Sequence, residues 1–196
     1  MTGASRGHLA MLLFSALVAG SFSLGSMTAN EIAPAALNAF RFWLAALVVG
    51  LLVAGTGRMR PVHFRAPWRF LVLGGLFGAY FVMMFEGLKT APPVSAAAVF
   101  TLTPVITGGI GYLILRQVVT PRMAKALVIG GIGALWVIFR ADLSALVAFD
   151  IGRGEAIYFV GCVSHAIYTV LVRFLNRGEP VMVFTFGTLI GGAVTV

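Results

Sequence analysis

Charged residues are scarce in this sequence, and their scarcity excludes an ordinary soluble fold. Only 10% of the 196 residues are charged, while 60% are hydrophobic. An average soluble domain carries roughly 25% charged residues, which cover its surface. The mean hydropathy of +1.00 is also high. This composition is typical of a protein that crosses a membrane several times.

Cysteine and the usual catalytic motifs are also missing. A single cysteine, Cys162, excludes an intramolecular disulfide framework. No His, Cys, Asp and Glu residues follow metal-ligand spacing, and no GxxxxGK[ST] phosphate loop occurs. Ser164 and His165 are adjacent and would diverge on a helix, so they form no nucleophile and base. We therefore expect no enzyme, no cofactor and no bound metal.

Apolar segments fill most of the chain. Each of seven has close to the roughly 20 residues that a membrane-spanning helix needs, and short polar separators lie between them. This pattern predicts an all-α membrane protein, a polytopic transmembrane helix bundle. The last segment has only sixteen residues, so we expect the chain to be a fragment of a longer protein. The segments are 8–29, 34–56, 68–88, 93–115, 122–140, 154–174 and 181–196.

The basic residues predict the orientation of the bundle. With a cytoplasmic N-terminus, the inner loops hold 10 of the 14 Lys and Arg residues, as the positive-inside rule requires. The rule also explains the basic loop GRMRPVHFRAPWR, so we expect no nucleic-acid partner. The predicted location is the cell (inner) membrane, with the lipid bilayer as surroundings. A homo-oligomer is left open.

Two stretches of the chain echo each other. GHLAMLLFSALVAGSFSLGSMTANEIAP begins at Gly7, and GEAIYFVGCVSHAIYTVLVRFLNRGEP begins at Gly154. Their starts are five segments apart, so the two copies would run in opposite directions through the membrane. Inverted repeats of this kind are typical of secondary transporters. We therefore expect a first repeat over residues 1–145 and an incomplete second repeat over residues 146–196.

Three features inside the apolar segments have a functional and a structural interpretation. Pro104 removes the hydrogen bond to the Phe100 carbonyl, which predicts either a hinge or a packing kink. His165 lies in mid-segment, where an ionisable residue is a candidate for function and for proton transfer, or is a neutral hydrogen-bonded histidine. Gly74 and Gly78 form a GxxxG match that predicts close helix packing within one molecule, with dimerisation as the alternative.

Arg41 lies inside the second apolar segment, seven residues from its start at Pro34. At 1.5 Å per residue this is about 10 Å, the outer third of a hydrocarbon core rather than its centre. One interpretation is a structural anchor at the outer end of the helix. In the other, Arg41 faces inward and meets a helix terminus, a carboxylate such as Glu31 or Glu86, or an anionic substrate.

Four stretches resemble the EamA-type transporters of the drug/metabolite transporter superfamily. They are APAALNAFRFWLAAL, VSAAAVFTLTPVITGGIGYLIL, VVTPRMAKALVIGGIGALWVI and GEAIYFVGCVSHAIYTVLVRFL. The resemblance implies two inverted five-helix repeats that move small metabolites, often amino acids or related compounds, by alternating access. The family often has a Gly-Glu pair where this chain has Arg116 and Gln117, so a carboxylate role is not carried over to that position.

These observations predict a transporter or exporter of small metabolites, secondary-active or facilitative. The resemblance implies that the first, third, fourth and sixth segments line its cavity, and we choose lining candidates there by depth and polarity. One alternative is a membrane subunit that acts by helix–helix assembly with other chains, and another is a membrane enzyme acting on lipid. The cavity candidates are Phe22, Tyr80, Met84, Phe100, Thr103, Tyr158 and His165, with Pro104 and Arg41 as hinge or structural residues.

Overall fold

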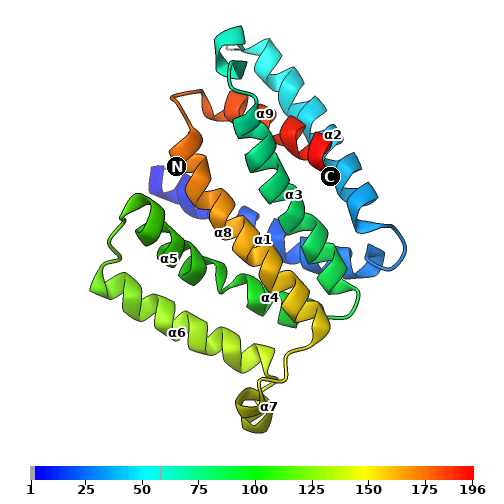
Figure 1. Cartoon of the computed structure of the whole chain (residues 1–196), viewed down its shortest axis with the longest axis vertical. Helices are drawn as coiled ribbons and strands as arrows, with labels where there is room; N and C mark the ends of the chain where they lie inside the picture. The colour runs from blue at the N-terminus through cyan, green and yellow to red at the C-terminus, as the bar shows by residue number, and fades with distance from the viewer. Residues whose placement is uncertain (1–2, 58) are drawn as a thin grey trace.

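The expected helices are present in a computed structural model, which describes residues 3–57 and 59–196 (Figure 1). The described residues form helices and connecting loops, and six spans are long and apolar enough to cross a membrane. The prediction of a polytopic helix bundle is confirmed. The elements are α1 (Gly3–Thr28), α2 (Pro34–Gly55), the 3₁₀ helix η1 (Pro61–Phe64), α3 (Trp68–Leu88), α4 (Pro93–Phe100), α5 (Thr103–Leu115), α6 (Pro121–Ile138), α7 (Leu143–Ala148), α8 (Arg153–Leu175) and α9 (Val181–Thr195).

Local sequence signals explain where several helices begin. Pro34, Pro93 and Pro121 open α2, α4 and α6, where a missing N–H leaves no helical hydrogen bond unmade. The short helix α7 falls in a stretch that the apolar pattern treats as a loop. Asp142 caps it by accepting hydrogen bonds from the backbone N–H groups of Ser144 and Ala145 at 2.8 and 3.3 Å. A helix of six residues is too short to be recognised from a periodic apolar pattern.

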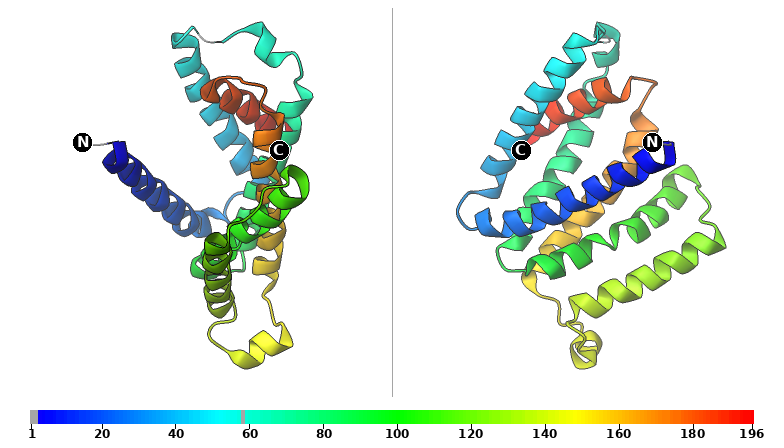
Figure 2. Two further views of the ribbon diagram at one scale, coloured as in Figure 1. Left: turned by 90° about the vertical axis from the view of Figure 1, so that its left-hand side faces the viewer. Right: turned by 180° about the vertical axis from the view of Figure 1, so that it is seen from behind.

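The pair α3 and α8 forms the centre of the molecule, with the other helices arranged around it (Figure 1). On one side, α9 packs against both α2 and α3. On the other side, α4 and α5 pack against α8, and α6 packs against α4. Helix α1 contacts α3 and α4 and then diverges from the remaining helices towards the N-terminus (Figure 2).

Glycines allow α3 and α9 to approach at backbone distance. A Cβ atom at Gly74 would collide with the backbone of Gly191 and Gly192, and one at Gly191 would collide with the Phe70 carbonyl. These contacts involve backbone atoms, which no side-chain rotation can relieve. The close packing that the GxxxG pattern predicts at Gly74 and Gly78 is therefore confirmed within the chain.

A buried ion pair joins the first turn of α3 to the α8–α9 loop. The Arg69 guanidinium donates to the Leu175 carbonyl at 2.6 Å and to the Glu179 carboxylate at 2.8 Å, and both charged side chains are at most 5% exposed. Burial raises the pKa of the Glu179 carboxyl. The hydrogen bonds from Arg69 and from the Arg177 N–H outweigh that effect and hold the pKa below its ordinary value.

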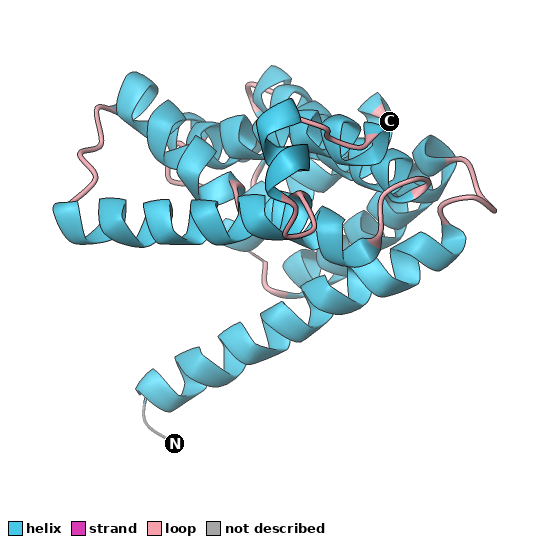
Figure 3. Ribbon diagram, turned by 90° about the horizontal axis from the view of Figure 1, so that it is seen from below, coloured by secondary structure: helices cyan, strands magenta, loops and turns pink. Residues whose placement is uncertain are grey.

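The outward surfaces of the helices are strongly apolar. Large side chains project from α1, α2 and α6, among them Leu12, Leu51 and Ile129, each at least 67% exposed. Seen from below, α1 projects from the other helices along much of its length (Figure 3). Exposed apolar area of this extent suits hydrocarbon rather than water, which supports a multi-pass membrane protein.

Candidate functional site

The fourth apolar segment is one membrane span, Pro93–Leu115, in which regular helix is interrupted at Thr101 and Leu102. Helix α4 ends at Phe100 and α5 begins at Thr103, and the break between them is visible in Figure 1. Pro104 has no N–H to donate to the Phe100 carbonyl, and the N–H groups of Val105 and Ile106 both donate to Leu102 at 3.0 and 3.1 Å. Regular helical hydrogen bonding is therefore lost beside Pro104, and a hinge role for Pro104 stays a prediction. Interrupted helices inside a membrane are tolerated where protein or a cavity surrounds the freed backbone.

An aromatic cluster lies beside this break and draws on four helices. The Tyr80 ring of α3 lies 4.6 Å from His165 and 5.9 Å from Tyr158, both of α8, and 6.0 Å from Phe100 of α4, as ring centroids. Phe22 of α1 lies 5.8 Å from Tyr158. Edge and tilted geometries at these separations stabilise aromatic pairs beyond their burial alone.

Two tyrosine hydroxyls meet inside the cluster. Tyr80 and Tyr158 share a hydrogen bond of 3.1 Å between their hydroxyl oxygens, and Tyr158 is fully buried. This pairing gives each buried hydroxyl a hydrogen-bond partner. A hydroxyl buried in an apolar interior without such a partner would cost free energy. The Tyr80–Tyr158 bond therefore links α3 to α8 inside the cluster.

A cavity of about 670 Å³ opens on the α5 side of the break. Phe100 and Thr103 line it from the broken helix and His165 lines it from α8. Gln117 adds an amide from the loop between α5 and α6. The Nδ1 atom of His165 is buried without a hydrogen-bond partner among the described residues. The cavity thus combines aromatic walls with polar groups, as small-molecule sites generally do.

The structure brings the seven cavity candidates into one region, but it separates them by environment. Phe100, Thr103 and His165 line the cavity, although Thr103 is itself only 6% exposed and its hydroxyl oxygen is buried. Four others are packed in the hydrophobic core with at most 6% of their surface exposed: Phe22, Tyr80, Met84 and Tyr158. That any of the seven contacts a substrate stays a prediction.

Arg41 of α2 does not line the cavity at the break and instead lines a cavity between α1, α2 and α3. Its guanidinium carbon lies 5.1 Å from the centre of the Phe81 ring and 5.2 Å from that of Phe85, so cation–π attraction stabilises the charge. The carboxylate partners considered from sequence do not supply an ion pair in the described chain, since Glu86 binds Lys89 at 2.7 Å instead. The anchoring role of Arg41 stays a prediction.

Sequence reasoning missed two buried carboxylates. Glu155, in the first turn of α8, accepts a hydrogen bond from the Ser95 hydroxyl of α4 at 2.8 Å and is 4% exposed. Glu179 accepts the hydrogen bond from the Arg69 guanidinium described above. Both residues lie in polar separators or at helix ends, where sequence alone indicates an exposed position. The signal for Glu155 is its place in a helix first turn, where a carboxylate is stabilised by the helix dipole.

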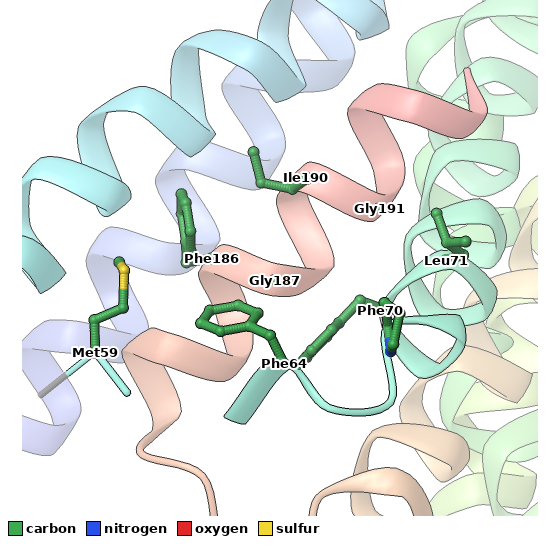
Figure 4. Close-up of a pocket in the computed structure, with 9 residues that line it drawn as sticks. Met59, Phe64, Phe70, Leu71, Phe186, Gly187, Ile190 and Gly191 are labelled. Carbon is green, nitrogen blue, oxygen red and sulfur yellow. The ribbon is translucent and has the colours of Figure 1, made fainter. Parts of the chain in front are cut away.

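A different hollow, of about 480 Å³, lies between η1, α3 and α9 (Figure 4). Phe64, Phe70 and Phe186 form its walls, and the close-up shows apolar side chains around it. It contains none of the predicted site residues. Because its lining offers no polar side chain to orient a solute, it suits an apolar neighbour rather than a substrate.

Comparison with known proteins agrees with this architecture. A model of the EamA-like transporter family matches residues 5–139, which run from the start of α1 through α6. The chain belongs to this family. EamA-like proteins are transporters rather than enzymes, as expected from the missing catalytic motifs.

Two curated relatives extend the match. The chain is 31% identical over 193 residues to the "Uncharacterized transporter YyaM" of Bacillus subtilis (strain 168), an alignment of 96% of this chain and 63% of the relative. It is 34% identical over 96 residues to "Protein PecM" of Dickeya dadantii (strain 3937), covering 48% of this chain and 32% of that protein. The chain thus spans less than two thirds of either relative. No solved structure gives a significant match.

Proposed function

We propose that this EamA-like chain belongs to a transporter, secondary-active or facilitative, that moves small metabolites, such as amino acids and related compounds, across the cell membrane by alternating access. Residues 1–145 form its first repeat and residues 146–196 begin an inverted second repeat, with the N-terminus cytoplasmic. The family match and the YyaM relative support a transporter. The location of the solute pathway is our inference from geometry.

The single observation that carries this inference is the break between α4 and α5 at the 670 Å³ cavity. Discontinuous helices near the bilayer midplane are a recurring way for transporters to present backbone groups to a solute. Here Thr103 and Phe100 flank the break and line the cavity, and the His165 ring of α8 lies 5.8 Å from the Phe100 ring. The aromatic cluster behind Phe100 fixes the position of this wall.

Uptake into proteoliposomes tests the proposal. Purified protein would be reconstituted and offered a panel of labelled amino acids, sugars and nucleosides, with protein-free vesicles as the blank. Thr107→Val removes the hydroxyl of a half-buried residue that lines the cavity, and it is expected to reduce uptake of the carried solute about fivefold or more, since one hydrogen bond contributes roughly 1 kcal/mol or more. Tyr112→Phe removes an exposed hydroxyl of α5 and serves as the matched control.

The outcomes separate the alternatives. Uptake by the wild type that falls in Thr107→Val but not in Tyr112→Phe supports a solute pathway at the break. If size-exclusion chromatography shows folded protein but no solute is taken up above the protein-free blank, the result would instead favour a subunit that acts by assembly with other chains.

His165 is the candidate proton carrier in this scheme. Its half-buried ring faces the cavity, and Nδ1 has no partner among the described residues. If transport is coupled to protons through this ring, uptake by the wild type changes with pH and His165→Gln removes that change. An unchanged pH profile in His165→Gln would exclude the coupling role.

A further inference from the structure

Arg41 holds unused hydrogen-bonding capacity inside an apolar helix. A guanidinium has five N–H donors, yet in the described residues only one hydrogen bond from it is recorded, to the Asn38 side-chain oxygen at a long 3.4 Å. Asn38 is almost fully buried, and its amide nitrogen donates to the Pro34 carbonyl at 2.8 Å. That bond turns the Asn38 oxygen towards Arg41 and fixes one edge of the guanidinium.

The charge of Arg41 has no counter-ion within the described chain. The two ion pairs recorded there use other cations, Arg69 and Lys89. Phe81 and Phe85 attract the cation with their ring faces but offer it no lone pair. A cation inside a membrane generally pairs with an anion or marks a substrate pathway, so the anion is expected from outside the described residues.

Open space adjoins the guanidinium on two sides. A cavity of about 370 Å³ lies between α1, α2 and α3, and another of about 190 Å³ lies between α2, α3 and α9; Arg41 lines both. The larger cavity could hold a whole small metabolite, whereas the smaller one leaves room for little more than a single group.

The larger cavity also contains two hydroxyl oxygens from α1. Ser21 donates its proton to the Leu17 carbonyl at 2.8 Å, and Thr28 donates to the Gly25 carbonyl at 3.2 Å. Each oxygen keeps lone pairs that accept hydrogen bonds. The cavity between α1, α2 and α3 therefore places an anion-binding group opposite oxygens that can accept from an ammonium group.

We propose that Arg41 binds the carboxylate of the transported solute in the cavity between α1, α2 and α3. This site is separate from the wall at the helix break, and it deepens and rests on the proposed transport function by naming a solute class: metabolites with a carboxylate, and amino acids in particular. A planar guanidinium matches a carboxylate with two parallel hydrogen bonds.

Chemical labelling tests the binding step without requiring transport. Purified wild-type protein in micelles would be treated with phenylglyoxal, which modifies arginine, and labelling of each arginine would be followed by mass spectrometry. The probes are L-phenylalanine, L-leucine and L-lysine, each compared with the amine that lacks the carboxylate: phenethylamine, isopentylamine and cadaverine. We expect at least one acid to slow the labelling of Arg41 about tenfold or more and its amine to have no effect, while the exposed Arg173 is unaffected.

Equal labelling of Arg41 in the presence of every acid and its amine would overturn the proposal. Protection of Arg41 by vesicles containing anionic phosphatidylglycerol but by none of the acids would also overturn it, because the anion would then be a lipid phosphate. Protection by an acid in a protein that carries no solute would leave the carboxylate site standing and refute the proposed function instead.

Transport then measures what the contact contributes. In proteoliposomes the wild type is expected to prefer the protecting acid over its amine by about 10- to 100-fold, the range for a charge-assisted pair. Arg41→Gln should bring the two within about twofold, and Arg41→Lys should keep part of the preference, since it retains a charge but not the two-bond geometry. Arg173→Gln is the matched control. The proposal would be contradicted if Arg41→Gln retained the full preference for the acid. It would also be contradicted if Arg41→Lys lowered uptake of acid and amine by the same factor, because the preference would then be unchanged.

Discussion

Breaking the buried pair of Arg69 and Glu179 by removing one partner should be among the most destabilising single substitutions in this chain. Arg69→Leu removes two hydrogen bonds, at 2.6 Å to the Leu175 carbonyl and 2.8 Å to the Glu179 carboxylate. It also leaves that carboxylate, whose side chain is 5% exposed, without its cation. Removing one partner of a buried pair costs about 3–5 kcal/mol in proteins.

A matched series separates the charge from the hydrogen bonds. Glu179→Gln keeps the shape of the side chain and one oxygen, which can still accept from Arg69 or from the Arg177 N–H, at 2.7 Å in the wild type, so we expect a smaller loss of about 1–3 kcal/mol. The double variant Arg69→Leu/Glu179→Leu removes both charges and should recover much of the loss in Arg69→Leu, since apolar replacement of a buried pair is often neutral.

The measurement is reversible unfolding in mixed micelles, followed by tryptophan fluorescence. Glu179 also predicts a pH dependence: its pKa in the folded state lies below the ordinary value of 4.5. Its stabilisation is therefore complete above about pH 4.5 and is lost as pH falls through the folded pKa. Glu179→Gln should flatten that part of the profile. A loss below about 1 kcal/mol in Arg69→Leu, or an unchanged acid profile in Glu179→Gln, would refute the reasoning.

Two further predictions concern packing. Gly191→Ala should cost about 1–3 kcal/mol, the usual range for overpacking, because its Cβ would meet the backbone of Phe70; Gly130→Ala, where a Cβ meets nothing within 4 Å, should be neutral or stabilising by up to about 1 kcal/mol. The same unfolding assay measures both, and equal effects would exclude the close approach. Tyr80→Phe and Tyr158→Phe should each destabilise by about 1–3 kcal/mol by leaving a buried hydroxyl unpaired, and the double variant should cost less than the sum of the two. Strict additivity in that cycle would show that the 3.1 Å contact contributes nothing.

The membrane-spanning helices were predictable because hydropathy over about 20 residues is a strong signal. The predicted segment 68–88 coincides with α3, and 181–196 differs from α9 by one residue. Pro104 indicated a kink or a hinge in the fourth segment, since proline removes a helical hydrogen bond, and the gap between α4 and α5 lies next to it. The short helix α7 was not predictable, because six residues are too few to show a helical apolar pattern. The Asp142 cap alone is too weak a signal to predict a helix.

The candidate site was predictable only in part. Depth along a helix placed Tyr80 and His165 near each other, and the structure brings their rings within 4.6 Å. Depth does not reveal which side of a helix faces a cavity, so Tyr158 was chosen with the lining residues although it is fully buried. The partner of Arg69 could not be predicted from the sequence. A pair separated by 110 residues depends on how α3 packs against the α8–α9 loop.

Filling the cavity at the helix break tests the central claim most directly. Gly108 lines that cavity, and a Cβ there would make only ordinary contacts, at 3.7 Å to Leu127 and 3.8 Å to Val119. We predict that Gly108→Trp abolishes proteoliposome uptake of the solute that the wild type carries, while Gly130→Trp on the open side of α6 leaves uptake intact. Full uptake by folded Gly108→Trp would contradict a solute pathway at the break.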